Sequence, residues 1–590
     1  MKLRYGKDDW LELEPVSLDS HVQRGMRTFS LGPQVAMASP TERAAASRAA
    51  VVANRVVQQV FQKSVPAYAS PAQRAAADLD KVKTAVFSDP RGTLRVVYRE
   101  VVLRFEPNVA EAKQKAVLDK YGLQVRVRNA FQSDQLIAFD PTRKYIAEKM
   151  VELANELTET DEVVFAFPNF VSEFKRGLQA PKPIAAQWHL ATVNARRAWS
   201  KSQGGGIVIA VLDDGVDVDH PNLASNIRRR PDPNEPRDRF GRDFFVGEDA
   251  PDHFDPTPKR FRAPFDMMAG NDIHGTCCAG VAAASGRKGV FGIAPRASIL
   301  PVKIFHADDL ATESQVANAI RYASRFADIL SCSWSGPASP DIRFALEEAG
   351  AGRGGKGCPV FCATGNDFRD QVGFPAQSPF SIGVGASTDQ GDLADYSNRG
   401  PQVSVVAPSS GGAQGIFTTD VSKPGRGFNI GSAAAGGTDG LNTNVFGGTS
   451  SATPLAAGVA ALVLAANSSL SRDDVRNILQ STAEKIGPAA SYDANGHSDR
   501  FGFGQVDAAA AVDAALAAAA AARVAPDGPK PAKKAAKKRA PSKAKKTAPA
   551  RKAAGKTAKA TAKKGGRKTA RKTAKKTTKK TVKKKAKKSG

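Results

Sequence analysis

The segment Gly448-Thr449-Ser450 has the composition of a tight turn that leads into a helix and presents a serine at its start. Small apolar residues follow from Ala452 to Ala461, which predicts a buried helix. A serine in that place lies near backbone N–H groups and the positive end of the helix dipole, which stabilise developing negative charge. The first hypothesis is therefore nucleophilic catalysis by Ser450. It requires a base, an acid that orients the base, and a second hydrogen-bond donor.

Two apolar runs and one helix start supply these groups. Gly206–Leu212 is rich in β-branched residues and predicts a buried strand that ends at Asp213. His274 stands before a helix of small residues, and a second strand-like run, Pro359–Ala363, leads to Asn366. Because open α/β folds place their ligands at the carboxyl ends of parallel strands, we expect these side chains to meet at one sheet edge.

Four short blocks carry a family resemblance. They resemble, in the same order, the signature blocks of the subtilisin-like serine peptidases, over roughly residues 185 to 520: Asp213-Asp214-Gly215, His274-Gly275-Thr276, Ala363-Thr364-Gly365-Asn366 and Gly448-Thr449-Ser450. The resemblance implies that Ser450 is the nucleophile, His274 the general base and then acid, and Asp213 the residue that orients the imidazole. It also implies that Asn366 donates its side-chain amide to the oxyanion, together with the backbone N–H of Ser450.

The implied fold is α/β, a subtilisin-like three-layer arrangement with a mainly parallel sheet, over residues 185–524. Residues 96–176 show a β-α-β-β-α-β pattern that predicts a small ferredoxin-like α+β domain. Its place before a subtilisin-like domain resembles the family's propeptide, which inhibits by laying its tail in the cleft; an unrelated small domain is the alternative. Residues 174–177, Phe-Lys-Arg-Gly, are a candidate processing site. Residues 1–95 have no assigned role and are expected to be partly helical, over Thr41–Gln62.

Three residues compete with the assigned catalytic groups. Asp214 is beside Asp213, but Asp213 follows the strand directly and matches the motif, so we expect Asp214 to face the cleft or to hydrogen-bond locally. Ser451 stands at a variable position of the motif and is expected to be structural. His220 lies in a predicted turn, where a histidine is expected to form hydrogen bonds without a catalytic role.

Substrate-binding candidates follow the predicted strand at Asp328–Cys332. In subtilisin relatives the equivalent edge pairs with the substrate backbone, which is strand addition. The candidates are Ser333, Trp334, Ser335 and Gly336, with a core position as the alternative for Trp334.

Some features lean toward the kexin and furin branch of the family, namely the doubled aspartate, Cys278 and the Ser-Trp pair. An acid expected near position 372 to bind a basic side chain is a valine, so strict specificity for paired basic residues is not expected. The reaction needs no cofactor, and no metal ligands are assigned. Structural calcium stays open but lacks a clear ligand set, because Asn222 replaces the expected acid and residues 286–289 carry positive charge.

The C-terminal residues 525–590 form a polybasic tail. Residues 530–590 contain 28 Lys and Arg and no Asp or Glu, against a net charge of +27 for the whole chain, so the remainder is nearly neutral. The tail is expected to be disordered and resembles the tails of linker histones. Without aromatic residues it is expected to bind phosphates by charge alone, in DNA or another nucleic acid, without reading sequence. A solubilising tail, an anionic membrane and polyphosphate are the alternatives.

Five cysteines, an odd number, all lie in the expected catalytic domain. They favour free thiols in a reducing compartment. No secretory leader and no apolar run of membrane-spanning length is seen. We therefore expect a cytoplasmic, nucleoid-associated serine endopeptidase that acts on protein or peptide substrates; its oligomeric state is not encoded. The alternatives are a nucleic-acid-associated protein with a silent or autoinhibited peptidase domain, and a secreted peptidase.

Overall fold

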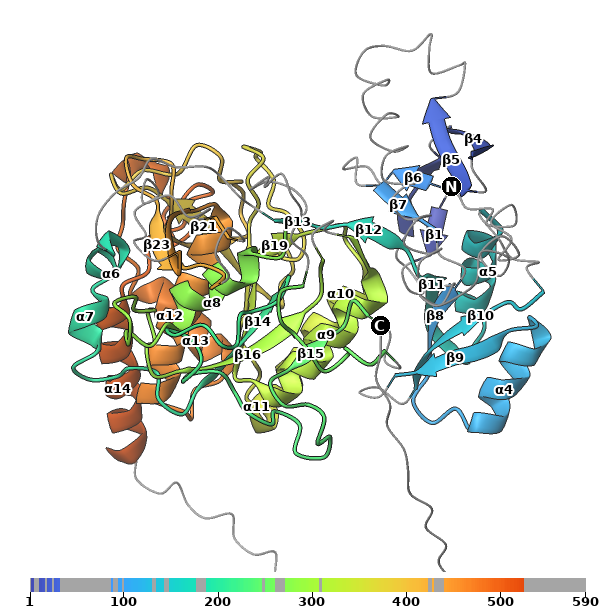
Figure 1. Ribbon diagram of the computed structural model, residues 1–590, viewed down its shortest axis with the longest axis horizontal. Coiled ribbons are helices and arrows are strands. Elements are labelled where there is room, and N and C mark those ends of the chain that lie inside the picture. The colour runs from blue at the N-terminus through green and yellow to red at the C-terminus, as the bar shows by residue number, and fades with distance from the viewer. Residues whose placement is uncertain are drawn as a thin grey trace, which may run out of the picture. The chain divides into compact units, whose positions relative to one another are not determined.

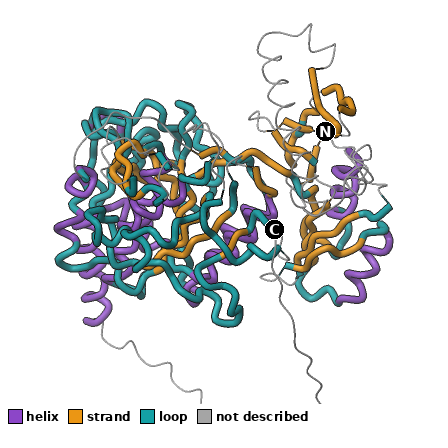
Figure 2. Tube along the Cα trace, viewed as in Figure 1, coloured by secondary structure: helices purple, strands orange, loops and turns teal. Residues whose placement is uncertain are grey.

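The computed structural model describes residues 2–4, 10–15, 18–23, 26–31, 86–88, 94–97, 100–129, 134–142, 148–176, 187–246, 250–259, 271–306, 310–422, 427–428 and 440–524. The chain divides into two units, residues 1–526 and 527–590, and all described residues lie in the first. Figures 1 and 2 show its helices and strands. The polybasic tail lies outside the described residues, and α14 (Ala508–Val524) is the last described element.

A seven-stranded sheet in which every neighbouring pair is parallel forms the centre of the larger domain. Its order is β15 (Arg242–Asp243), β16 (Ser298–Lys303), β14 (Val208–Asp213), β18 (Ile329–Cys332), β20 (Val360–Ala363), β21 (Ile382–Ser387) and β22 (Val403–Pro408). The strands are buried because helices cover both faces, as a parallel sheet requires.

The two faces of the sheet contribute to separate hydrophobic cores. In β14, Ile209 and Val211 join one core, whereas Val208, Ala210 and Leu212 join the other, as the alternation of a strand dictates. The first core contains α8 (His274–Ala283), α12 (Thr449–Ala466) and α14; the second contains α9 (Glu313–Phe326) and α10 (Pro340–Glu348). Helix–sheet–helix layering confirms the predicted α/β fold.

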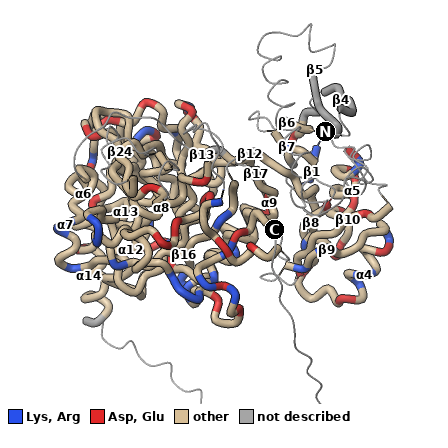
Figure 3. The backbone as a smooth tube through the Cα atoms, viewed as in Figure 1, with Lys and Arg blue, Asp and Glu red and all other residues tan. Residues whose placement is uncertain are grey.

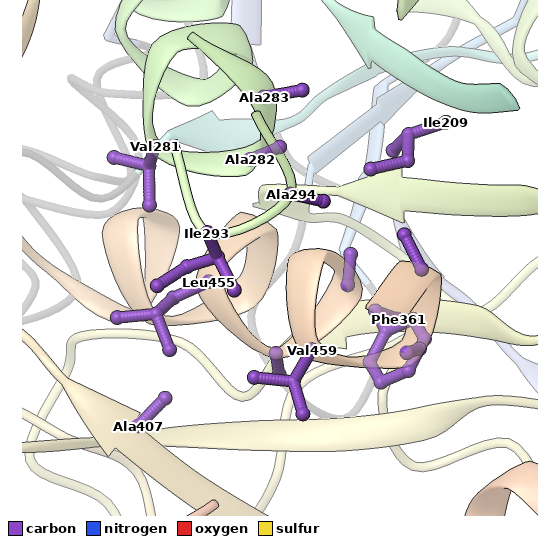
Figure 4. Packing of buried hydrophobic residues seen from close by; sticks show 14 of the residues in the cluster. Ile209, Val281, Ala282, Ala283, Ile293, Ala294, Phe361, Ala407, Leu455 and Val459 are labelled. Atoms are coloured by element: carbon purple, nitrogen blue, oxygen red, sulfur yellow. The ribbon is translucent and has the colours of Figure 1, made fainter. Parts of the chain in front are cut away.

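Small side chains let α8 and α12 pack closely together on the first face. Figure 4 shows Ile293 between Val281 of α8 and Leu455 of α12, with Ile209 and Phe361 at the other side of the view; all five belong to this core. Among the described helices, α12 alone is long and apolar enough to cross a membrane, but 89% of that stretch is buried within the protein. It is the core helix of this domain.

Shorter elements complete the larger domain. They are α6 (Trp188–Thr192), α7 (Ala195–Ala198), α11 (Gly352–Gly355), α13 (Arg472–Ser481), the 3-10 helices at Ala349–Ala351 and Ala489–Ser491, and the antiparallel pair β23 (Ile416–Thr419) and β24 (Asn442–Phe446).

The smaller domain has the predicted ferredoxin-like order. Its elements are β8 (Glu100–Phe105), α4 (Glu111–Lys120), β9 (Gln124–Arg128), β10 (Gln135–Phe139), α5 (Glu148–Thr158) and β11 (Val163–Pro168). They form an antiparallel sheet in the order β11-β8-β10-β9, with a hydrophobic core of its own.

Residues 2–96 contribute strands, which the sequence analysis did not predict. They are β1 (Lys2–Arg4), β2 (Trp10–Glu12), β3 (Glu14–Pro15), β4 (Leu18–Gln23), β5 (Met26–Leu31), β6 (Val86–Ser88) and β7 (Leu94–Val96). Leu3 and Leu13 are buried in the core of the ferredoxin-like domain, and Asn155 of α5 bonds to the backbone of Lys2 and Arg4. This packing extends that domain toward the N-terminus. The helix expected at residues 41–62 lies outside the described residues.

We expect the buried His189 of α6 to make the free energy of unfolding depend on pH. Its ring is fully buried, and burial lowers its pKa from the ordinary 6.5 to about 3. The native state therefore holds His189 neutral, while the unfolded chain takes up a proton as the pH falls through 6.5. We expect the free energy of unfolding to fall by about 2 kcal/mol more between pH 7.5 and pH 5 with His189 than with His189→Phe.

Chemical denaturation at the two pH values measures this difference, in Ser450→Ala chains so that self-cleavage cannot interfere. Leu190→Ala, at a buried residue of the same helix that does not titrate, is the control and should keep the pH dependence of the parent. An equal pH dependence of parent and His189→Phe would contradict the burial of a neutral ring.

Candidate active site

The four assigned catalytic residues lie at the carboxyl edge of the parallel sheet or at the start of a helix that faces it. Asp213 is the last residue of β14, and Asn366 follows the end of β20. His274 is the first residue of α8, and Ser450 is the second residue of α12. The strand ends and the two helix starts therefore place these groups as the sequence order suggested.

Asp213 and His274 are in direct contact and fully buried. Both carboxylate oxygens of Asp213 lie 2.9 Å from Nδ1 of His274. Nε2 of the same ring has no hydrogen-bond partner among the described residues. A carboxylate on Nδ1 fixes the tautomer with its proton there, so that Nε2 is the nitrogen that can accept a proton.

Gly275 allows this contact. A Cβ at position 275 would lie 2.3 Å from the carbonyl oxygen of Gly215 and 2.9 Å from Cβ of Asp213. Both distances are too short for real atoms, so only glycine lets the first turn of α8 approach the end of β14. The His-Gly pair of the motif is therefore a steric requirement of the site.

Ser450 is held by two hydrogen bonds to one neighbour. Its Oγ donates to the carbonyl oxygen of Ser333 at 3.0 Å, and Oγ of Ser333 donates to the carbonyl oxygen of Ser450 at 3.0 Å. Gly448, with φ +77°, forms the turn before it in a region that favours glycine. The sulfur of Cys278 lies 3.7 Å from the Ser450 carbonyl oxygen and 3.6 Å from Nδ1 of His274, so this buried thiol sits between the two catalytic segments.

Asn366 is fixed by its side-chain oxygen. Oδ1 accepts hydrogen bonds from the backbone N–H of Thr449 at 2.8 Å and from its Oγ1 at 2.9 Å. With the oxygen used in this way, the Nδ2 amide is the end that can donate to a substrate. Thr449, which sequence reasoning did not single out, thus couples Asn366 to the residue before Ser450.

Asp214 accepts three backbone hydrogen bonds from the start of α8. Ile273 N–H and His274 N–H donate to Oδ2 at 2.9 and 3.0 Å, and Gly275 N–H donates to Oδ1 at 2.7 Å. The carboxylate is fully buried. Of the two expected roles, local hydrogen bonding is the one the geometry shows, because Asp214 caps the helix that carries His274.

A buried ion pair lies behind this cap. Nζ of Lys303 is 2.5 Å from Oδ2 of Asp272 and donates to the carbonyl oxygen of Asp214 at 2.7 Å. Burial alone would raise the pKa of Asp272, but the Lys303 ammonium and His306 outweigh it and hold the pKa below the ordinary range. Sequence reasoning missed this pair. Its one signal was a lysine at the end of the apolar run Ser298–Val302.

The substrate-binding candidates form the edge element β19 (Trp334–Ser335), and their side chains differ in position. Trp334 is fully buried, and its Nε1 donates to the carbonyl oxygen of Leu212 at 2.9 Å, so the core alternative holds for its side chain. Ser333 bonds to Ser450 as described, and the N–H of Gly336 donates to the carbonyl oxygen of Phe374. The backbone of β19 is paired with β13 (Lys175–Arg176) of the N-terminal domain in antiparallel register.

Phe174, just before β13, is buried against the same candidates. Its ring centroid is 5.5 Å from that of Trp334 and 5.3 Å from that of Phe305. A Cβ at Gly336 would lie 2.3 Å from the Phe174 ring, so Gly336 makes room for it. The end of the candidate processing segment, Gly177, lies outside the described residues.

The rival residues have structural partners. His220 is buried, with Nε2 2.8 Å from the carbonyl oxygen of Leu441 and Nδ1 accepting from Asn222 N–H. Oγ of Ser451 lies 2.8 Å from Oγ of Ser409. Val372 is fully buried, so this position offers no carboxylate that could bind a basic side chain of a substrate.

The loop where the resemblance would place calcium offers no clear ligand set among its described residues. Oδ1 of Asn222, which stands at the place of the expected acid, accepts the backbone N–H of Lys288 at 2.7 Å. Among the described acidic, histidine and cysteine side chains, one group of three could share a metal ion, and it is Asp213, His274 and Cys278 of the site itself. Asp213 and His274 are bonded to each other in this group, so the catalytic assignment already accounts for it.

Comparison with known proteins now identifies the family. Residues 204–504 match the model of the subtilase family. The chain is 33% identical over 469 residues to the calcium-dependent protease of Nostoc sp. strain PCC 7120, covering 73% of this chain and 65% of that protein. It is 32% identical over 313 residues to thermitase of Thermoactinomyces vulgaris, covering 52% of this chain and 92% of thermitase.

A solved protease structure from Pseudoalteromonas arctica, 27% identical, covers 57% of this chain and all of its own, with a TM-score of 0.45. The chain spans 65% of the length of the Nostoc relative. The match to the family model takes in all four catalytic blocks, Asp213, His274, Asn366 and Ser450. This chain belongs to the subtilase family of serine endopeptidases.

Proposed function

We propose that this subtilase hydrolyses peptide bonds within proteins or peptides by way of an acyl-enzyme at Ser450. The observation that carries the proposal is the buried Asp213–His274 contact, which leaves Nε2 as the basic nitrogen, at the same sheet edge as Ser450. A serine hydroxyl becomes nucleophilic only when a neighbouring base takes its proton.

The residues then act in a fixed order. Oγ of Ser450 gives its proton to Nε2 of His274 as it attacks the carbonyl carbon of the substrate. Asp213 stabilises the imidazolium from the other side of the ring. The oxyanion receives hydrogen bonds from Nδ2 of Asn366 and from the backbone N–H of Ser450, and His274 returns the proton to the leaving amine. Water repeats the sequence on the acyl-enzyme.

We further propose that Asp214 is a positioning residue for His274. Three N–H groups at the start of a helix have no partners within the helix, and the Asp214 carboxylate satisfies those of residues 273–275. A rotation of α8 that moved the imidazole from Asp213 would break these bonds. The cap therefore holds the base in its reactive orientation without touching the substrate.

The N-terminal domain is proposed to inhibit the site, as a propeptide does. β12 (Val171–Glu173) pairs with β17 (Leu310–Thr312), and β13 pairs with β19. At β19 the tail of this domain therefore occupies the backbone edge where strand addition would place a substrate. Arg95 and Glu313, both fully buried and 2.8 Å apart, tie the two domains together. Burial raises the pKa of Glu313, and the Arg95 guanidinium partly offsets this.

The polybasic tail is proposed to tether the peptidase to nucleic acid, with a location in the cytoplasm on the nucleoid. The support is the composition of residues 530–590, which are rich in Lys and Arg, have no aromatic side chain that could stack on bases, and have almost no bulky apolar side chain that could enter a bilayer. The second candidate, a nucleic-acid-associated protein with a silenced peptidase, is favoured by the tail of the N-terminal domain on β19.

Substitutions at Ser450 and Asn366 test the catalytic assignment. We expect Ser450→Ala to abolish hydrolysis of a casein-derived peptide. Asn366→Ala should lower kcat by about 10²–10³, the loss known for an oxyanion donor of subtilisin, a member of the same family. Steady-state kinetics measures both. Full activity of Ser450→Ala would refute the catalytic triad. If a chain that lacks residues 1–176 but keeps Ser450 has no activity, the silent peptidase is favoured instead.

Asp214→Ala separates positioning from substrate contact. We expect kcat to fall by about 10- to 100-fold at unchanged KM, because a charge-assisted cap contributes about 1.5–3 kcal/mol to the geometry of His274. Asp214→Asn should retain part of the activity. Asp217→Ala, a carboxylate of the same loop that bonds to Ser422, is the matched control. A raised KM at unchanged kcat would place Asp214 in the cleft instead.

Phe174→Ala tests the inhibitory tail in the full chain. Loss of the ring from its pocket beside Trp334 should weaken docking of the tail and raise the rate of fluorophosphonate labelling of the site at least tenfold. Phe174→Leu, which keeps an apolar side chain there, should stay near the parent rate. Equal labelling rates for all three chains would show that this segment does not block access.

Removal of the tail tests the tether. In Ser450→Ala chains we expect residues 1–590 to bind a fluorescent DNA duplex and residues 1–526 to lose most of that affinity. Binding by the full chain should fall by about 10³–10⁵ between 50 and 200 mM salt if it neutralises about 6–10 phosphates. Equal affinity of both chains would refute the tether.

A further inference from the structure

The loop that carries Asn366 is held by one residue from another part of the chain. Asn398 lies between β21 and β22 and is only 2% exposed. It forms four hydrogen bonds to the backbone of residues 364–369, two before Asn366 and two after it. The loop that follows β20 is therefore fixed from outside, on both sides of the proposed oxyanion donor.

The two bonds before Asn366 are made at Thr364 and Gly365. The Nδ2 amide of Asn398 donates to the carbonyl oxygen of Thr364 at 3.1 Å, and its backbone N–H donates to that of Gly365 at 2.9 Å. Gly365 has φ +103°, and a Cβ at this position would lie 2.4 Å from Nδ2 of Asn398. The glycine that precedes Asn366 is thus required by the close approach of Asn398.

The two bonds after Asn366 converge on one oxygen. Oδ1 of Asn398 accepts the backbone N–H groups of Asp367 and Arg369, both at 3.0 Å. Phe368, between them, has φ +55° and is 62% exposed. A left-handed residue lets neighbouring N–H groups point at a common acceptor, but this conformation is strained for phenylalanine and persists only where the surrounding structure enforces it. Asn398 provides that constraint.

The segment that contains Asn398 also contacts the turn before Ser450. The carbonyl oxygen of Tyr396 accepts the backbone N–H of Phe368 at 3.0 Å. Oη of Tyr396 lies 2.9 Å from Oγ of Ser409, which donates to the carbonyl oxygen of Gly448 at 2.8 Å. One segment therefore holds both parts of the chain that carry the proposed oxyanion donors.

The two helices that carry His274 and Ser450 contain no Lys, Arg, Asp or Glu, and Figure 3 draws α8 and α12 in tan. These helices bring no side-chain cation to the oxyanion. In the proposed mechanism its charge is met by hydrogen bonds from Nδ2 of Asn366 and the backbone N–H of Ser450. Because a misplacement of about 1 Å can cost about 10²-fold in rate, the reaction depends on what holds the loop of Asn366.

We propose that Asn398 is a positioning residue for the oxyanion hole. It holds residues 364–369 so that the amide of Asn366 lies where the oxyanion of the substrate forms. The inference rests on the proposed acyl-enzyme mechanism and adds to it a residue that acts only through Asn366.

A double-mutant cycle on kcat tests this role in full chains, with the casein-derived peptide as substrate. Asn398→Ala should lower kcat by about 10- to 100-fold with little change in KM, since an oxyanion donor acts on the transition state. In a chain that already carries Asn366→Ala, the same substitution should lower kcat by less than about threefold, because no amide is left to position.

Asn467→Ala is the matched control and should keep the kcat of the parent. Asn467 is also a buried asparagine that bonds to backbone groups, the carbonyl oxygen of Ala515 and the N–H of Ser469, but it lies at the far end of α12 from Ser450.

Asn398→Asp keeps an oxygen for the two N–H groups after Asn366 and should lose less kcat than Asn398→Ala. Circular dichroism of the Ser450→Ala forms shows whether each variant folds. If Asn398→Ala does not, Asn398→Asp takes its place in the cycle, and the same non-additive result is expected.

Two results would overturn the inference and leave the proposed mechanism standing. One is a parent-like kcat in Asn398→Ala. The other is a pair of losses that multiply in the double variant, which would make Asn398 a structural residue that acts independently of Asn366. An unchanged kcat in Asn366→Ala would instead overturn the oxyanion assignment and the inference together.

Discussion

His274 can reach Asp213 only because α8 approaches the end of β14 more closely than any side chain at position 275 would allow. A Cβ there would lie 2.3 Å from the carbonyl oxygen of Gly215. The approach brings three backbone N–H groups of α8 onto the buried carboxylate of Asp214, and the Lys303 ammonium holds the Asp214 carbonyl from behind. The orientation of the catalytic base thus depends on one glycine, one cap and one buried ion pair.

The helices on the two faces of the sheet carry different groups. α8 and α12 carry His274 and Ser450 on one face of the sheet. Small residues in the core between these helices let them pack closely. α9 and α10 on the other face bear the contacts with the N-terminal domain, including the Arg95–Glu313 pair. Because β13 of the N-terminal domain pairs with β19 beside Ser450, the segment proposed to inhibit the site lies next to the catalytic serine.

Local sequence patterns, together with the family resemblance of the four blocks, predicted the parallel sheet, the ferredoxin-like domain and the places of Asp213, His274, Asn366 and Ser450 at strand ends or helix starts. Each is marked by a strand end or helix start in its own segment. The buried ion pairs behind the site and between the domains were not predictable, because the two residues of each pair are far apart in the chain. Lys303 lies 31 residues from Asp272, and Arg95 lies 218 residues from Glu313. The strands before residue 96 were also missed, since short edge strands carry little periodicity of their own.

Mass spectrometry of the chain after reaction with a fluorophosphonate tests the central claim most directly. The predicted result is one adduct, on the peptide that contains Ser450, whose formation is lost in His274→Ala and accelerated when residues 1–176 are removed. No adduct on Ser450 in the chain without residues 1–176, or labelling that is unchanged by His274→Ala, would contradict a serine peptidase whose nucleophile is activated by the Asp213–His274 pair.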